Sequence, residues 1–119
     1  MTQVTNSKPE ALDNRTYRFA VDVKVFIKQL PRSLSNTEYA KQLIRSSGSV
    51  AANYIEANES LSRKDFVMRC RISRKEVKES RLWLKLVDPS ETQEAERSRL
   101  LQESTELLKI LSAIIEKST

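Results

Sequence analysis

The chain has 119 residues, and its 21 Lys and Arg residues outnumber its 16 Asp and Glu residues, which gives a formal net charge of +5. This length suits a single domain, and one Gly with three Pro is too few turn residues for an all-β fold. The sequence has no histidine, and no uncharged run approaches the ~20 residues of a membrane-spanning helix.

Cysteine content and the N-terminal sequence indicate the compartment. Cys70 is the single cysteine, so no internal disulfide forms, which is typical of a protein in a reducing compartment. Residues 1–14 are polar and lack the apolar stretch of a secretion signal. We therefore expect a cytosolic (cytoplasmic) protein.

The first helix is predicted from about Thr16 to Gln29, after residues 1–14, which we interpret as a flexible N-terminal arm preceding a domain of residues 15–119. Apolar residues recur through this helix at helical spacing: Phe19, Ala20, Val23, Phe26, Ile27 and Leu30. Pro31 ends the helix, because proline disfavours the helical conformation of the residue before it.

The second helix is predicted to begin with the sequence Ser35-Asn36-Thr37-Glu38. This is the pattern of a capping box, in which Ser35 is the N-cap and Glu38 reaches back to it. Its expected core face consists of Ala40, Leu43, Ile44, Ser47, Ala51 and Tyr54. Gly48 costs roughly 1 kcal/mol of helix propensity, which is tolerable if a neighbouring helix approaches closely at that point.

Two further helices are predicted in the second half of the chain. A second capping signal, Ser62-Arg63-Lys64-Asp65, starts the third helix, which is expected to end at Asp88-Pro89. Its core face consists of Phe66, Ser73, Val77, Ser80, Leu84 and Val87. The fourth helix is expected to start near Ser90, and its core face consists of Leu100, Leu101, Leu107, Leu108, Leu111, Ile114 and Ile115.

The links between these helices are short, and short links make consecutive helices antiparallel neighbours. The predicted fold is therefore all-α, an antiparallel up-down-up-down four-helix bundle.

The residue types that catalysis needs are mostly missing. Without histidine the chain has no Ser–His or Cys–His pair and no Glu-x-x-His motif of a di-iron bundle, and one glycine cannot make a phosphate-binding loop. Cys70 lies between two arginines that favour a reactive thiolate, but we interpret it as a small residue beside the core. Four acids are interpreted as solvated or salt-bridged: Glu56, Glu59, Glu76 and Glu79. We predict no enzymatic activity, catalytic residue, metal, cofactor or small-molecule substrate, and no membrane partner.

A basic stripe is the first candidate site. Its seven cations fall within about a third of the circumference of the third helix at 100° per residue: Lys64, Arg71, Arg74, Lys75, Lys78, Arg81 and Lys85. Such a line of cations is suited to the phosphate backbone of RNA or DNA. The other interpretation is a solvated helix face that neighbouring acids partly neutralise. The residues we predict to bind nucleic acid are Lys64, Arg71, Arg74, Lys78, Arg81 and Lys85.

An apolar strip is the second candidate site. Ile72, Trp83 and Leu86 lie on a flank of the third helix away from its predicted core face, with Glu76 and Glu79 between them. Tryptophan beside apolar neighbours is typical of a protein interface. We predict an oligomer interface at these residues, and the other interpretation is that Trp83 covers the edge of the bundle's own core.

The segment from Arg45 to Leu86 resembles a known family. Arg45-Ser46-Ser47-Gly48-Ser49-Val50-Ala51-Ala52-Asn53-Tyr54-Ile55-Glu56-Ala57 is similar to the second-helix signature of the bacterial four helix bundle protein family, which includes proteins encoded in intervening sequences of 23S ribosomal RNA genes. The match continues at Ser62, Asp65-Phe66, Ile72, Lys75-Glu76, Glu79 and Trp83-Leu84. Many relatives have Ala-Glu-Gly where this chain has Ile55-Glu56-Ala57.

This resemblance implies an antiparallel bundle that assembles into a ring, with a homopentamer as the first expectation. Related accessory proteins of diversity-generating retroelements resemble a pentameric barrel that binds a reverse transcriptase and nucleic acid through a basic surface. The family as a whole implies no firm biochemical role. We predict a non-catalytic oligomer that binds RNA or DNA through the basic stripe; the alternative is a protein-interaction scaffold with no nucleic-acid role.

Overall fold

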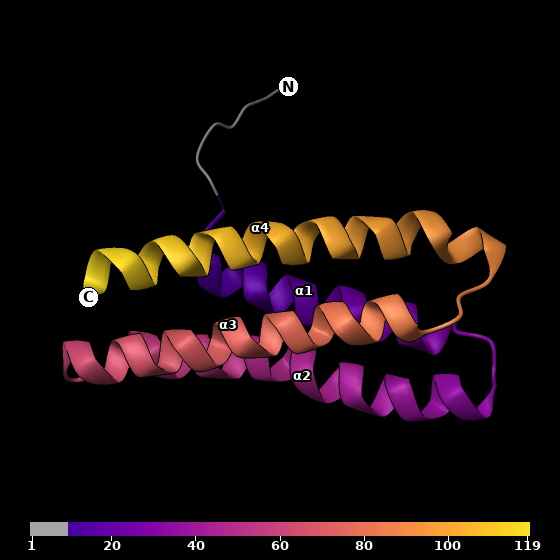
Figure 1. Cartoon of the computed structure of the whole chain (residues 1–119), viewed down its shortest axis with the longest axis horizontal. Helices are drawn as coiled ribbons and strands as arrows, with labels where there is room; N and C mark the ends of the chain where they lie inside the picture. The colour runs from indigo at the N-terminus through magenta and orange to yellow at the C-terminus, as the bar shows by residue number, and fades with distance from the viewer. Residues whose placement is uncertain (1–9) are drawn as a thin grey trace, which may run out of the picture.

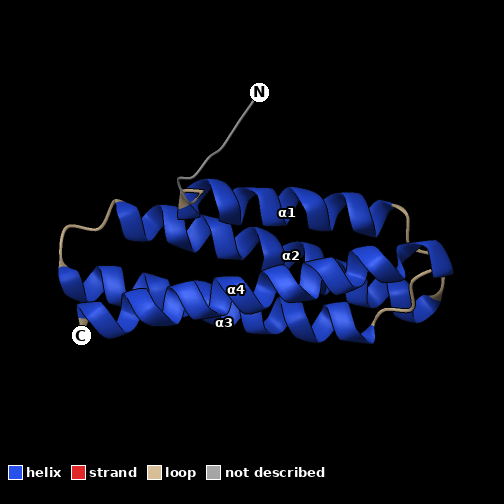
Figure 2. Cartoon of the chain, turned by 90° about the horizontal axis from the view of Figure 1, so that it is seen from above, coloured by secondary structure: helices blue, strands red, loops and turns tan. Residues whose placement is uncertain are grey.

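The computed structural model describes residues 10–119, which form four α-helices joined by short links (Figure 1). These are α1 (Leu12–Lys28), α2 (Leu34–Asn58), α3 (Arg63–Leu86) and α4 (Glu94–Ser118), with a single 3-10 turn, η1 (Glu91–Gln93), directly before α4. Consecutive helices lie side by side and run in opposite directions in both views (Figures 1 and 2). The predicted four-helix bundle is therefore confirmed.

The start of α1 differs from the sequence-based boundary. The helix begins at Leu12 instead of Thr16, so residues 12–14 of the predicted arm belong to the helix. The amide of Arg15 already donates to the carbonyl of Ala11 at 2.9 Å, and Asp13 in the first turn is favourably placed against the helix dipole. Apolar spacing alone does not mark this first turn, because residues 13–15 are polar. Residues 1–9 of the predicted arm lie outside the described residues.

The capping signals have different outcomes in α2 and α3. The prediction for α2 is wrong: Ser33 is the N-cap, its side chain accepts from the amide of Asn36 at 3.0 Å, and Ser35 lies inside the first turn. In α3 the predicted cap is confirmed, because the Ser62 hydroxyl accepts from the amide of Asp65 at 3.1 Å. The amide of Thr37 also donates to the Ser33 carbonyl at 3.0 Å, so the first turn of α2 starts two residues earlier than the predicted capping box.

The later boundaries also move slightly. The third helix ends at Leu86 instead of Asp88-Pro89, and η1 separates Ser90 from the first residue of α4. Ser90 and Gln93 form a reciprocal capping box around this turn. The carboxamide of Gln93 also donates to the carbonyl of Phe26 at 3.1 Å. The link between α3 and α4 is therefore attached to the end of α1.

The main core lies along the bundle axis and uses all four helices. Its buried members are Phe19, Val23, Phe26, Leu43, Val50, Val77, Leu84, Val87, Leu100, Leu107 and Leu111. A smaller cluster of Ala57, Val67, Cys70 and Ile115 fills the end of the bundle where α2 passes into α3. The predicted core faces of α1 and α4, and most of the α3 face, are therefore confirmed.

The buried face of α2 is rotated about the helix axis relative to the predicted core face. Ile44 was expected inside but is 48% exposed, whereas Ser46 and Val50 are fully buried. The reason is the close contact of α2 with α3, in which the Ser46 and Ser80 hydroxyls lie 2.8 Å apart and Ser73 donates to the Val50 carbonyl at 2.8 Å. Small hydroxyl side chains thus form part of this interface, and among them Ser46 lies outside the predicted core face of α2.

Gly48 lies on the outer face of α2. No atom of the described chain comes within 4 Å of the position that a Cβ would occupy there. The expected close approach of a helix is therefore absent within residues 10–119, and packing inside the bundle does not explain this glycine.

Candidate nucleic-acid interface

The basic stripe follows the outer side of α3. Ser62 fixes where the helix starts, and Val77 and Leu84 bury its opposite face at 0% exposure. Five cations consequently point to solvent as exposed residues: Lys64, Arg71, Lys75, Lys78 and Lys85. The structure thus brings most of the predicted stripe into one line on the surface.

Arg81 is placed differently from these five. It is only partly exposed, and its Nη1 donates to the Leu101 carbonyl at 3.0 Å and to the Ser104 hydroxyl at 2.9 Å. The same nitrogen also contacts the Thr105 hydroxyl. Arg81 therefore connects α3 to α4 and has a structural role.

Arg74 also turns toward α4. It is partly exposed, and its Nη1 donates to the Ser112 hydroxyl at 3.2 Å. Helical spacing placed Arg74 and Arg81 at the edge of the stripe, and the neighbouring helix supplies acceptors on that edge. They border the line of exposed cations.

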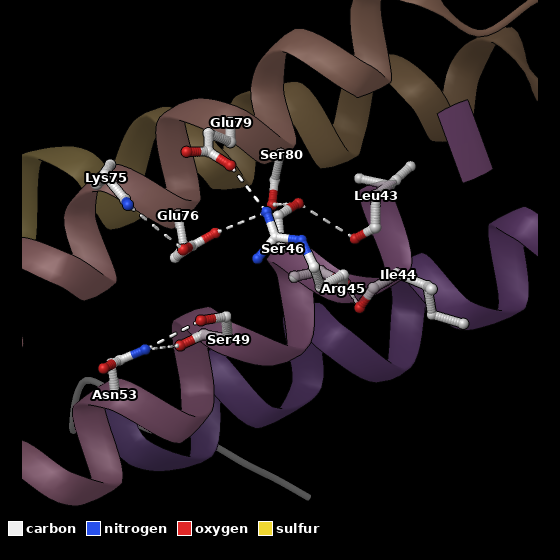
Figure 3. Close-up of polar contacts among 11 residues, drawn as sticks. Leu43, Ile44, Arg45, Ser46, Ser49, Asn53, Lys75, Glu76, Glu79 and Ser80 are labelled. Atoms are coloured by element: carbon white, nitrogen blue, oxygen red, sulfur yellow. Dashed lines mark hydrogen bonds and ion pairs between the residues drawn. The ribbon is translucent and has the colours of Figure 1, made fainter. Parts of the chain in front are cut away.

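An ion-pair network borders the stripe on the α2 side (Figure 3). Arg45 Nη2 lies 2.9 Å from Glu79 Oε1 and 3.4 Å from Glu76 Oε1. Glu76 is buried, at 5% exposure, and Lys75 Nζ lies 4.0 Å from its other oxygen. The interpretation of these two acids as salt-bridged groups is confirmed. Because Arg45 already neutralises them in part, they subtract less from the positive charge of the stripe.

The more exposed members of the stripe have no such partners. Among the ion pairs found in residues 10–119, none includes Lys64, Arg71, Lys78 or Lys85. Several acids elsewhere on the bundle are paired with other cations, as Glu103 is with Arg15 at 2.7 Å. The outer side of α3 is therefore a region of uncompensated positive charge.

The apolar strip is partly incorporated into the bundle. Trp83 is half-buried, packs against the main core and stacks on Tyr39 with ring centroids 5.8 Å apart. Ile72 is also half-buried, and Leu86 is 41% exposed. The Trp83 indole nitrogen is buried and has no hydrogen-bond partner among the described residues. Trp83 thus covers the edge of the core, and Leu86 supplies the freely exposed part of the strip.

Two exposed apolar side chains of α3 were missed. Met68 is 47% and Leu82 is 48% exposed, and both lie among the cations of the stripe. Both lie on a face of α3 where charged residues predominate, so the charge pattern concealed them. The sequence does contain a signal for them, because each is an apolar residue at a position predicted to face solvent.

Cys70 does not present a reactive thiol. It is fully buried beside Val67 and Ile115, and burial raises the pKa of the thiol above its ordinary value of 9.0. Within the part of the chain that the structure describes, no group of His, Cys, Asp and Glu side chains is arranged to hold a metal ion. No helix of that same part is both long and apolar enough to cross a bilayer.

These observations define an all-helical bundle with one basic helix face. The profile of the 23S rRNA-intervening sequence protein family matches residues 12–113, and the chain belongs to this family. No curated protein matches the chain.

A solved structure shares the fold. It is a protein of unknown function from the S23 ribosomal protein family of Bacteroides thetaiotaomicron. The two sequences are 31% identical, the match covers 88% of this chain and 98% of the other, and the TM-score is 0.74. Neither the family description nor that of this structure names a catalytic activity.

Proposed function

We propose that this protein is a non-catalytic module that binds the phosphate backbone of RNA or DNA through the outer side of α3. The observation that supports this most directly is the line of exposed cations on α3. Four of its members, Lys64, Arg71, Lys78 and Lys85, form no ion pair within residues 10–119. From Lys64 to Lys85 the helix rises about 30 Å, which is long enough to meet several successive phosphates. Contacts of this kind release counterions and do not read base sequence.

A non-catalytic role also agrees with the chemistry of the side chains. The sequence has no histidine, and Cys70, its single thiol, is buried with a raised pKa. The carboxylates Glu76 and Glu79 are engaged by Arg45. The positions of these side chains are better explained by a role in stabilising the fold than by a role in proton or group transfer.

The test is charge reversal on the exposed line. The triple variant Arg71→Glu, Lys78→Glu, Lys85→Glu should lose most low-salt binding to generic RNA and DNA. The steepness of its log–log salt dependence should fall by about 0.9 for each phosphate contact removed. Arg74 and Arg81 are left unchanged, because their hydrogen bonds to α4 make their reversal a test of folding as well.

The matched control is Lys24→Glu, Lys28→Glu, Lys117→Glu. These three lysines are exposed on α1 and α4, and their reversal changes the net charge by the same amount. We expect the control to retain most of the parent's affinity. Equal losses in the two variants, or no binding by the parent protein, would favour the scaffold alternative.

We also propose that the bundle works as a homo-oligomer, with a pentamer as the first expectation from the family resemblance. The exposed Leu86 and the unexplained Gly48 support contact with another copy. A ring would repeat the α3 cations once per subunit and so strengthen the field around the assembly. Sedimentation equilibrium should show one closed oligomer, and a clean monomer at micromolar concentration would refute this proposal.

Leu86→Asp is the variant best suited to test the apolar strip. It should weaken assembly with only a small loss of subunit stability, because Leu86 is 41% exposed and is not part of the main core. Trp83→Asp should weaken assembly too, but its stacking on Tyr39 predicts a loss of subunit stability at the same time. If Leu86→Asp leaves the assembly unchanged, the strip is not the interface.

A further inference from the structure

A groove lies on the first half of α3, next to the end of the chain. Its volume is about 770 Å³, and it runs from Arg63 to Lys75 along α3 with Ser118 and Thr119 on its far side. Figure 1 shows why these residues meet: α3 begins at the same end of the bundle at which α4 finishes. The groove therefore depends on the tertiary fold.

The lining of the groove is apolar at its centre and cationic at its edges. Val67, Met68 and Ile72 provide the apolar surface, and Met68 is 47% exposed. Lys64 and Arg71 are among the cations on its rim, together with Arg63 and Lys75. Asp65 is the acidic side chain among the lining residues, so positive charge dominates.

Three of the four cations on the rim are available for a ligand, and Lys75 lies 4.0 Å from Glu76. Within residues 10–119 no acidic side chain forms an ion pair with Arg63, Lys64 or Arg71. Their aliphatic stems also extend the apolar surface, as is usual for long basic side chains.

We propose that this groove binds an acidic amphipathic helix of a partner protein. Met68 and Ile72 lie one turn apart on α3, so they match the apolar face of a partner helix, whose anchors recur at i, i+3 or i+4, and i+7. The rise from Arg63 to Lys75 is about 18 Å, which corresponds to about three turns of such a helix. Carboxylates flanking the anchors would then meet the cations on the rim.

The apolar centre distinguishes this ligand from nucleic acid. A phosphate backbone gains from the cations but gives Met68 and Ile72 nothing apolar to contact. The concave shape also favours a cylindrical ligand over a flat bilayer surface. The chain's own residues 1–9 contain Lys8 and no acid, so they lack the charge to complement the rim.

The test uses a synthetic helical peptide of about 14 residues, with leucine at i, i+3 and i+7 spacing and glutamate on both flanks. Its affinity for the full chain is measured by fluorescence anisotropy. Binding should weaken as salt is added, and a control peptide with glutamine in place of glutamate should bind distinctly less tightly.

Met68→Gln tests the apolar centre without changing the charge. Burial of a methionine predicts a loss of about tenfold in peptide affinity for this variant. The matched control is Leu82→Gln, because Leu82 is 48% exposed on the same helix but lies outside the groove. That control should bind the peptide within about twofold of the parent.

Several results would overturn the proposal. These are no peptide binding by the parent protein, equal effects of the two substitutions, or self-association that Met68→Gln abolishes while peptide affinity is unchanged. The last result would assign the groove to a second copy. RNA titration of Met68→Gln separates this inference from the nucleic-acid proposal, because loss of peptide binding with unchanged RNA binding supports the groove alone. Loss of RNA affinity equal to the loss of peptide affinity would count against it.

Discussion

Arg81 and Lys78 illustrate how two cations on one helix face acquire different roles. They lie less than one turn apart on α3, yet Arg81 donates to a carbonyl and two hydroxyls of α4, and Lys78 is exposed. The difference arises because α4 passes one edge of the stripe and offers acceptors there. A helical wheel of α3 does not show where α4 lies, so it cannot distinguish these two cations.

Replacing Arg81 by Met should therefore destabilise the fold, and replacing Lys78 by Met should not. The Arg81→Met substitution removes hydrogen bonds from a charged donor on α3 to Leu101, Ser104 and Thr105 of α4, which predicts a decrease of about 1–3 kcal/mol in the free energy of unfolding. Lys78→Met should change it by less than about 0.5 kcal/mol. Urea unfolding measures both, and similar effects of the two variants would contradict the structural role of Arg81.

Cys70 predicts a specific dependence of stability on pH. Burial raises the pKa of its thiol above the ordinary value of 9.0, so the unfolded thiol ionises first as pH rises. The stability due to the neutral buried thiol is present below that value and is lost as pH rises toward the raised pKa.

The measurement compares the parent with Cys70→Val, which has a similar volume and no ionisable group. The free energy of unfolding of the parent should fall more steeply above pH 9.0 than that of the variant. Urea unfolding on both sides of this pH provides the values. Parallel curves for the two proteins would show that the thiol does not ionise more easily in the unfolded chain.

At the scale of an element, the start of α2 offers a direct comparison of two serines. Ser33 accepts from the amide of Asn36, whereas Ser35 is exposed within the first turn. Ser33→Ala should lower stability by about 1 kcal/mol through loss of the cap, and Ser35→Ala should have little effect. Thermal and urea unfolding check this, and a larger effect at Ser35 would restore the sequence-based capping box.

Substitution of Gly48 can affect both the stability of α2 and the association of subunits. Alanine has space at this position in the isolated bundle, so Gly48→Ala should raise subunit stability by about 0.5–1 kcal/mol through helix propensity. If another copy packs closely against α2, the same methyl group should weaken association. Unfolding and sedimentation of one variant therefore separate the two effects. A variant less stable as a monomer would show that the bundle itself requires this glycine.

At the scale of the whole molecule, the main core connects all four helices. Leu84 is fully buried within it. Leu84→Ala should lower the free energy of unfolding by about 2–5 kcal/mol, as for other buried leucines. Circular dichroism during urea unfolding should still show one transition, because the main core contains residues of all four helices. A loss below about 0.5 kcal/mol would place Leu84 outside the core.

The sequence by itself determined the number, type and order of the helices. Apolar residues at helical spacing, Ser62 as a cap and the short links were enough, because these signals are local. The core faces of α1 and α4 also followed, since large apolar side chains mark them. The location of the basic stripe on α3 is likewise a property of spacing along a single helix.

Tertiary structure decided which face of α2 is buried, which cations stay in solvent and where a groove forms. Ser46 and Ser80 meet across α2 and α3, and their hydroxyls satisfy each other only in that pairing. Arg81 is not part of the exposed line of cations, because its hydrogen-bond acceptors belong to α4. Met68 lines a groove, because the end of α4 lies opposite the first half of α3. Each outcome depends on residues distant in sequence, whose distances and hydrogen-bond partners exist only after the helices have packed.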